Sequence, residues 1–156
     1  MTKQVFPILF FILTANVNAE VLSFPSFRIE VPSGWEQIIE GGAHSSNASV
    51  ISLRPPSGAG ILRMRSHEAP GVVSKDRLRT LTNVEPSVPL MWGDWGDYSG
   101  YQHSYTENGV YHRQWWLISG RVILLIVYEA DPRSSDVETE AIENIVQSIT
   151  ANTQAR

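Results

Sequence analysis

The chain has 156 residues, no cysteine and a formal net charge of -4 at pH 7. This length is typical of one domain with its own core, and the absence of cysteine excludes disulfides, thiol catalysis and thiolate metal sites. The acidic balance argues against nucleic acid and anionic lipid as partners, since both are bound by clustered Lys and Arg. Five Trp, five Tyr and five Phe supply the large apolar surface that a core without disulfides needs.

Residues 1–19 predict a secretory signal peptide. They start with a basic residue, Lys3, continue with an apolar run over 5–13, and end in Val17-Asn18-Ala19. The run is too short for a membrane span, which needs about 20 residues, whereas small residues at these end positions fit a signal peptidase site. We therefore expect cleavage after Ala19, a mature domain over 20–156, a periplasmic or secreted location and no membrane insertion. An uncleaved interfacial anchor is the alternative.

The first half of the mature chain predicts strands joined by turns, followed by one short helix. Alternating apolar residues and turn signals indicate strands over 24–31, 35–39, 49–54 and 60–66. The Pro-rich turn at 55–58 predicts that the last two strands form a hairpin. Ser74 is a suitable N-cap for a helix from Lys75 to about Thr82.

The second half predicts a loop, a strand meander and a closing helix. Residues 83–98 are expected to be irregular, and strands are expected over 100–107, 110–119 and 121–129. Asn108-Gly109 is a strong two-residue hairpin turn, because both residues tolerate a positive φ. Ser135 and Glu138 match a capping box and predict a final helix that runs to about residue 150.

The strand at 121–129 indicates the fold class. Its apolar residues alternate onto both faces, which is typical of a strand inside a sheet that is covered on both sides. Two helices are available as covers. The sequence therefore predicts a single α+β domain, in which a twisted, mostly antiparallel sheet is covered on both faces by helices or long loops.

The order of several landmarks suggests a family. These are FRIEVPSGW at 27–35, YHRQWWLISG at 111–120, the strand at 122–128 and IVQSI at 145–149. Together they resemble the PsbP-like group, which includes the extrinsic photosystem II subunit, Mog-type Ran-binding proteins and bacterial periplasmic DcrB-like proteins. The resemblance implies a sheet sandwiched by helices, no shared catalytic residues, and a role in assembly, targeting or binding. Some periplasmic immunity proteins are similar in fold.

Histidines on the meander are candidate metal or ligand residues. The Asn108-Gly109 turn sets a register in which Tyr105 faces His112 and His103 faces Gln114, so both histidines share one face of the sheet. Neutral imidazoles are good metal ligands, but a zinc site also needs further ligands at suitable positions. The alternative is a half-exposed strand face on which the histidines hydrogen-bond to their neighbours.

The sequence contains no pattern that defines an enzyme. It has no nucleophile elbow, zinc-protease motif or phosphate loop. Ser104 follows His103 directly, and neighbouring strand residues point to opposite faces, so the two side chains are poorly placed to share a proton. We expect no catalytic residues and no cofactor.

The segment 92–98 (WGDWGDY) carries an aromatic residue at every third position, with acids and glycines between them. Aromatic anchors of this kind are common at protein-binding hot spots, so we expect a contact loop. The predicted contact residues are Trp92, Asp94, Trp95, Asp97 and Tyr98, together with His44 in the polar loop at 41–47. The alternative is that Trp92 and Trp95 fold back onto the edge of the sheet.

Three functions follow in order of preference. The first is an exported, non-enzymatic protein that binds another protein, with an immunity protein that neutralises a secreted effector toxin as its specific version. The second is a small-ligand or metal-binding accessory protein that uses His103 and His112. The third is a hydrolase.

Overall fold

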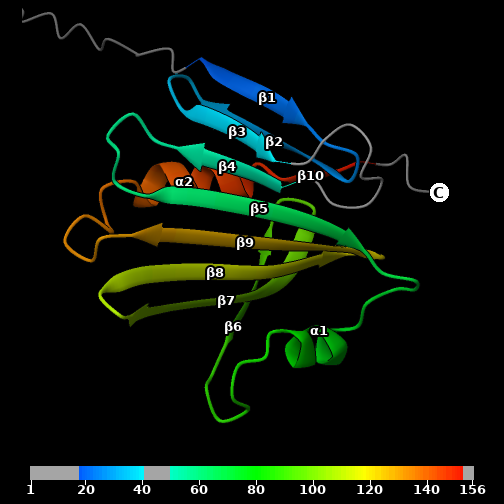
Figure 1. The fold of residues 1–156 in the computed structure, drawn as a ribbon. Coiled ribbons are helices and arrows are strands. Elements are labelled where there is room, and N and C mark those ends of the chain that lie inside the picture. Colours follow the sequence, from blue (N-terminus) through cyan, green and yellow to red (C-terminus); the bar gives the residue numbers. More distant parts are fainter. Residues whose placement is uncertain (1–17, 41–49, 153–156) are drawn as a thin grey trace, which may run out of the picture.

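The computed structural model describes residues 18–40 and 50–152, which form two antiparallel sheets and two helices (Figure 1). The larger sheet has seven strands in the order β3-β4-β5-β9-β8-β7-β6, and the smaller has three in the order β1-β2-β10. Most of the expected signal peptide, and His44, lie outside the described residues, so both remain predictions. Neither described helix is long and apolar enough to cross a membrane.

The elements have the following bounds. The larger sheet consists of β3 (Glu36–Glu40), β4 (Val50–Arg54), β5 (Ile61–Glu68), β6 (Met91–Trp95), β7 (Tyr98–Glu107), β8 (Val110–Ser119) and β9 (Val122–Ala130). The smaller sheet consists of β1 (Ala19–Ser23), β2 (Phe27–Pro32) and β10 (Thr150–Ala151). The helices are α1 (Lys75–Leu81) and α2 (Thr139–Gln147).

The core lies in two separate apolar clusters, one on each face of the larger sheet. The larger cluster joins the sheet to α2 and to the smaller sheet, through residues such as Trp115, Ile126 and Ile145. The smaller cluster lies under α1 and contains Leu78 and Trp116. Figure 1 shows α2 behind the sheet and α1 at the foot of the view. The predicted α+β fold with an antiparallel sheet is confirmed. The expected cover is present on one face and only partial on the other, where α1 packs.

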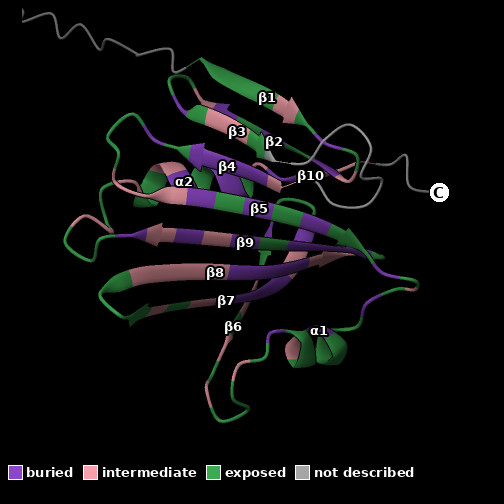
Figure 2. Ribbon diagram, in the orientation of Figure 1, coloured by how far each residue is buried: buried purple, intermediate pink, exposed green. Residues whose placement is uncertain are grey.

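The meander follows the predicted register. Asn108 and Gly109 have φ values of 51° and 76°, and Tyr105 pairs with His112 across the turn. Because side chains alternate along each strand, buried and exposed residues alternate along β5, as Figure 2 shows. The cap of α1 is also as predicted, since the backbone N–H of Arg77 donates to Ser74 Oγ over 3.2 Å.

The expected capping box of the last helix is wrong. α2 begins at Thr139, its N-cap is Glu138, and no side chain makes a capping hydrogen bond there. Ser135 Oγ donates instead to the carbonyl of Pro132 over 3.0 Å. Residues 132–138 form successive turns because Arg133 is held by Asp131, whose carboxylate accepts from the Arg133 backbone N–H over 2.9 Å.

The expected loop at 83–98 is wrong at its C-terminal end. Residues 91–95 form β6, which pairs with β7 in an antiparallel hairpin closed by Gly96 and Asp97. The chain also ends differently from the prediction: α2 stops at Gln147, and residues 150–151 pair with β2. The single strand expected over 24–31 is shorter, since Phe24 lies in a turn between β1 and β2.

The β6–β7 turn is docked against the C-terminal end of the fold. The Asp97 backbone N–H donates to the carbonyl of Ile149 over 2.9 Å, and Asp97 Oδ2 accepts from the Ala151 backbone N–H over 2.9 Å. Gly96 has a φ of +57°, and a Cβ at this position would lie 1.9 Å from the Ile149 carbonyl oxygen. Only glycine therefore permits this close approach of two backbone segments.

We predict that Gly96→Ala destabilises the protein more than Gly109→Ala does. Both residues have a positive φ, but a Cβ at Gly109 meets nothing within 4 Å. Gly109→Ala should therefore cost only the left-handed backbone strain, about 1–2 kcal/mol. Gly96→Ala should also displace β10 and cost at least about 3 kcal/mol. Urea unfolding of the three proteins measures both losses, and equal losses would contradict a role for the Ile149 contact.

Candidate functional site

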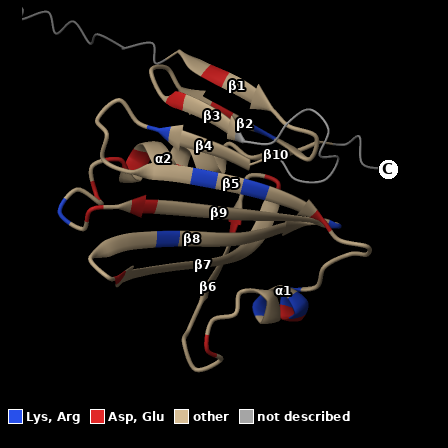
Figure 3. Cartoon of the chain, in the orientation of Figure 1, with Lys and Arg blue, Asp and Glu red and all other residues tan. Residues whose placement is uncertain are grey.

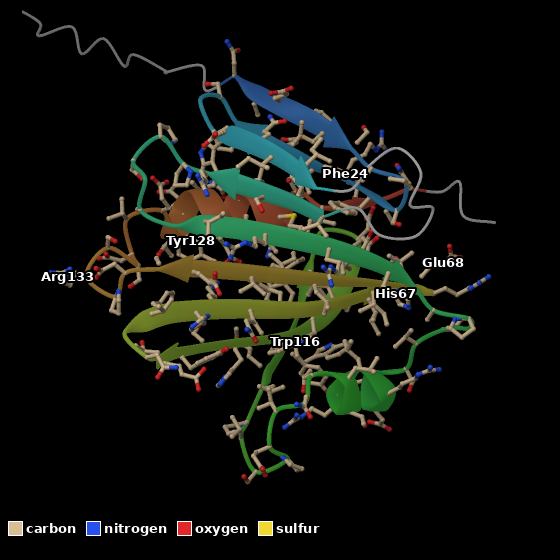
Figure 4. All side chains as sticks on the ribbon, in the orientation of Figure 1. Phe24, His67, Glu68, Trp116, Tyr128 and Arg133 are labelled. Carbon is tan, nitrogen blue, oxygen red and sulfur yellow. The ribbon has the colours of Figure 1, made fainter. Side chains whose placement is uncertain are left out.

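One face of the larger sheet is covered only in part. α2 and the smaller sheet cover the opposite face, whereas α1 covers this face only around Tyr101, Trp116 and Ile123. Figure 4 labels Trp116 close to α1. The remaining area is called the open face below. It carries side chains of β4, β5, β9, β8 and β7 that share one side of the pleat: Val50, Arg63, Arg65, Leu125, Val127, Glu129, His112, Gln114, Tyr105 and His103.

A shallow trough crosses the open face along β5 and β9. One hollow of about 280 Å³ is lined by Val50, Arg63, Met64, Arg65, Leu125, Val127 and Glu129. A second hollow of about 470 Å³ lies toward the β4–β5 turn and is lined by Glu36, Arg54, Pro55, Pro56, Gly58, Gly60, Ile61, Arg63 and Glu129. The two hollows share Arg63 and Glu129, so they form one continuous trough.

The trough has an apolar floor with charged walls. Leu125 is 36% exposed although it lies on an interior strand of the sheet. Arg63 makes an ion pair with Glu129, and His112 Nδ1 lies 3.5 Å from the other oxygen of that carboxylate. Arg65 has no ion-pair partner among the described residues. Figure 3 shows the basic bands of β5 beside the acidic band of β9.

The histidines of the open face pack against a tyrosine. The Tyr105 ring stacks on His112 with 4.8 Å between centroids and on His103 with 5.5 Å. Gln114 Nε2 donates to the Tyr105 hydroxyl over 3.1 Å. Burial first, and then the charges of Glu107 and Glu129, raise the pKa of Tyr105. The three rings therefore form a cluster whose faces are largely occupied by one another.

The two histidines have few other candidate metal ligands near them in the described part of the chain. Within residues 18–40 and 50–152, no group of three or more His, Asp or Glu side chains comes close enough together to hold a metal ion. His103 and His112 do share one face, as the sequence predicts. Glu107, a carboxylate on the same strand as His103, is exposed at the end of β7, next to the hairpin turn.

Two of the five predicted contact residues in 92–98 are buried. Trp95 is 4% exposed and Tyr98 is 1% exposed, and both belong to the larger cluster. Trp95 Nε1 donates to Glu143 Oε1 over 3.2 Å, and the Tyr98 hydroxyl donates to the carbonyl of Ser26 over 3.1 Å. Their expected role as exposed contact side chains is therefore wrong, because α2 and the smaller sheet cover this side of the hairpin.

The other three contact residues are also held by the fold. Trp92 is half-buried: it packs edge-on against Tyr101 at 4.9 Å, and the Lys75 ammonium lies 4.5 Å from its ring centroid. Asp94 and Asp97 are exposed, but Ser99 Oγ donates to Asp94 and the β10 backbone donates to Asp97. The structure thus shows the alternative arrangement, in which the tryptophans pack back onto the sheet.

Sequence reasoning missed the residues that line the trough. Arg63 and Arg65 alternate with buried residues along β5, and Leu125 and Val127 lie on the second apolar face of β9. The signal was present as two patterns in separate segments. It becomes a site only because β5 pairs with β9, which sets Arg63 opposite Val127 and Arg65 opposite Leu125.

Solved structures of other proteins are similar to this fold at low sequence identity. No family model and no curated protein matches the chain. A protein of Bacteroides thetaiotaomicron superimposes with a TM-score of 0.58 at 14% identity over 83% of this chain and 46% of that one, so the chain spans about half of its length. LpqN of Mycobacterium tuberculosis, which is involved in cell envelope biogenesis, superimposes with a TM-score of 0.51 at 15% identity. The match covers 88% of this chain and 92% of LpqN. These likenesses show the fold alone, and the PsbP-like resemblance stays a prediction.

We predict that Trp95→Ala unfolds the protein more readily than Trp92→Ala. Removing the buried indole leaves a cavity, for which losses of about 3–5 kcal/mol are typical, and it also removes one of the two hydrogen-bond donors to Glu143, the other being Arg113. Trp92 is half-buried, so Trp92→Ala should lower the free energy of unfolding by less than Trp95→Ala does. Urea unfolding measures both losses, and a Trp95→Ala protein as stable as the wild type would contradict the buried placement.

We also predict an alkaline loss of stability that depends on Tyr98. Burial, followed by the charge of Asp97, raises the pKa of Tyr98 to about 12, whereas an unfolded tyrosine titrates near pH 10. As pH rises, Tyr98 therefore loses its proton at a lower pH in the unfolded state than in the folded state. Its contribution to stability is complete below about pH 10 and is lost as pH rises toward 12. Urea midpoints over this range should fall less steeply for Tyr98→Phe than for the wild type. Identical slopes would contradict the prediction.

Proposed function

We propose that the protein is an exported, non-enzymatic protein that acts by binding another protein through the open face. The observation that carries this proposal is an interior strand, β9, that presents Leu125 and Val127 to the outside between arginine side chains of β5. A solvated face of an antiparallel sheet ordinarily carries polar residues. Apolar residues grouped there indicate an interaction surface.

The shape of the trough favours a protein over a small molecule. Small-molecule pockets are concave and bury most of the surface of their ligand, whereas the two hollows of the trough are shallow and open to solvent. A shallow hollow suits one or two anchor side chains of a protein partner, which carry much of the energy of such interfaces.

The non-enzymatic part of the proposal is supported by the placement of the polar side chains. His112 is paired with Glu129 rather than with a hydroxyl nucleophile. His103 and Ser104 are neighbours on β7 and so point to opposite faces of the sheet. These contacts stabilise the open face and leave no proton relay at it among the described side chains.

Two kinds of partner are consistent with export. The signal-like residues 1–19 and the fold shared with LpqN favour an accessory protein of the cell envelope. The chain length and the acidic net charge equally suit an immunity protein that neutralises a toxin in the periplasm. Both bind a protein, and they differ in whether the captured partner is a resident envelope protein or an effector toxin.

We predict that Leu125→Asp abolishes partner capture while Val137→Asp does not. Val137 is 58% exposed, precedes α2 and lines neither hollow of the trough, so it is a control for the introduced charge. The mature protein and both variants are used as bait in extracts of the native periplasm. We expect one stoichiometric partner for the wild type and Val137→Asp, and its loss for Leu125→Asp.

Thermal unfolding of the three baits provides the check on folding. A partner retained by a folded Leu125→Asp protein would exclude the open face from the interface. If none of the folded baits captures a protein from the periplasm, the protein-binding function is contradicted.

A further inference from the structure

We infer that the trough recognises an extended protein segment in which a carboxylate lies next to an aliphatic or aromatic side chain. This inference rests on the proposed function and adds the chemistry of the partner. It follows from three features of the trough: an apolar hollow, an arginine beside it that lacks an ion-pair partner among the described residues, and the direction of the strands beneath.

The hollow supplies the site for the apolar side chain. Val50 comes from β4, and Leu125 and Val127 come from β9, so they lie on either side of β5 and leave about 280 Å³ between them and the arginine stems. Arginine side chains cover apolar surface with their methylene groups while the guanidinium stays in water. An aliphatic or aromatic side chain seated here would therefore be surrounded by carbon on several sides.

Arg65 supplies the site for the carboxylate. Arg63 already makes an ion pair with Glu129, and Arg54 Nη1 lies 4.0 Å from Glu36 Oε2. Arg65 stands across the pleat from Leu125 without an ion-pair partner in the described parts of the chain. A planar guanidinium binds a carboxylate with two parallel hydrogen bonds, so a partner acid next to the seated apolar residue completes the charge balance.

The charge of the trough is opposite to that of the whole protein. The chain as a whole has a net charge of -4, whereas the trough is lined by three arginines, Arg54, Arg63 and Arg65, and two glutamates, Glu36 and Glu129. An acidic segment would be repelled by most of the surface and attracted here. Complementary charge of this kind steers encounter and fixes the register of binding.

The trough follows the direction of β5. Ile61, Arg63 and Arg65 lie on one side of the strand at every second position, so the row from 61 to 65 measures about 13 Å at about 3.3 Å per residue. An extended partner segment of about four or five residues spans this row. An acyl chain needs a longer and more enclosed cavity than the hollow provides, which favours a polypeptide as the occupant.

Photo-crosslinking in the native host tests the inference. The cross-linking residue p-benzoylphenylalanine replaces His67, which is exposed at the rim of the trough on β5 (labelled in Figure 4), so the hollow itself stays open. Matched probes replace Val21 on β1 and Val137 beside α2, which are 59% and 58% exposed. We expect a protein adduct at His67 alone, mapped by mass spectrometry to a segment with Asp or Glu beside an aliphatic or aromatic residue.

Charge reversal then tests the arginine. Adding Arg65→Glu to the His67 probe should lower the adduct yield at least tenfold. Arg65→Lys keeps the charge but loses the paired hydrogen bonds, so it should lower the yield less than Arg65→Glu does. Changing the mapped partner acid to lysine should restore the yield with Arg65→Glu. Thermal unfolding of each variant shows that the fold is retained.

The outcomes separate this inference from the proposed function. A protein adduct at Val21 or Val137 but not at His67 would keep protein binding and overturn recognition by the trough. An adduct at His67 would also overturn it in three cases: if Arg65→Glu leaves the yield unchanged, if the adduct maps to a segment without an acid, or if the adduct is a lipid. The absence of any protein adduct at all three probes would overturn the proposed function itself.

Discussion

The contact between the β6–β7 turn and the end of the chain determines the arrangement of the remaining parts. Gly96 lets the turn approach the carbonyl of Ile149, and Asp97 binds the backbone of residues 149 and 151 from both its N–H and its carboxylate. This joins the hairpin to α2 and to the smaller sheet, which together close one face of the larger sheet. The other face is left with α1 alone, and the open face is the consequence.

Local chemistry made the meander predictable. Asn108-Gly109 fixes a hairpin whose register follows from counting, and the two apolar faces of residues 122–130 indicate a strand inside the sheet. The segment 92–98 was not predictable in the same way. Aromatic residues at every third position fit an exposed loop and a packed hairpin equally well. The outcome depends on Glu143 and Ser26, which accept hydrogen bonds from Trp95 and Tyr98 and are distant in sequence.

The candidate site was even less predictable from the sequence than the segment 92–98. The alternation in residues 61–67 predicts that Arg63 and Arg65 share a face, and the alternation in residues 122–130 predicts that Leu125 and Val127 share one. Neither pattern says that the two strands are neighbours. β5 and β9 are separated in the chain by α1 and three strands, and their pairing is a property of the whole topology. Ordinary residues therefore become a site only when the sheet is complete.

The mixture of charge and apolar area on the open face bears on the kind of protein interaction proposed for it. Interfaces of obligate complexes resemble a divided core and are strongly apolar, whereas transient interfaces carry about as much polar area as the rest of the surface. Here Leu125 is flanked by arginines. Arg63 pairs with Glu129, and Tyr105 stacks on His112, so these side chains have partners within the fold. Most charged groups of the uncomplexed face thus have partners within the fold, whereas Arg65 has no ion-pair partner among the described residues. A surface built in this way suits a partner that binds and dissociates.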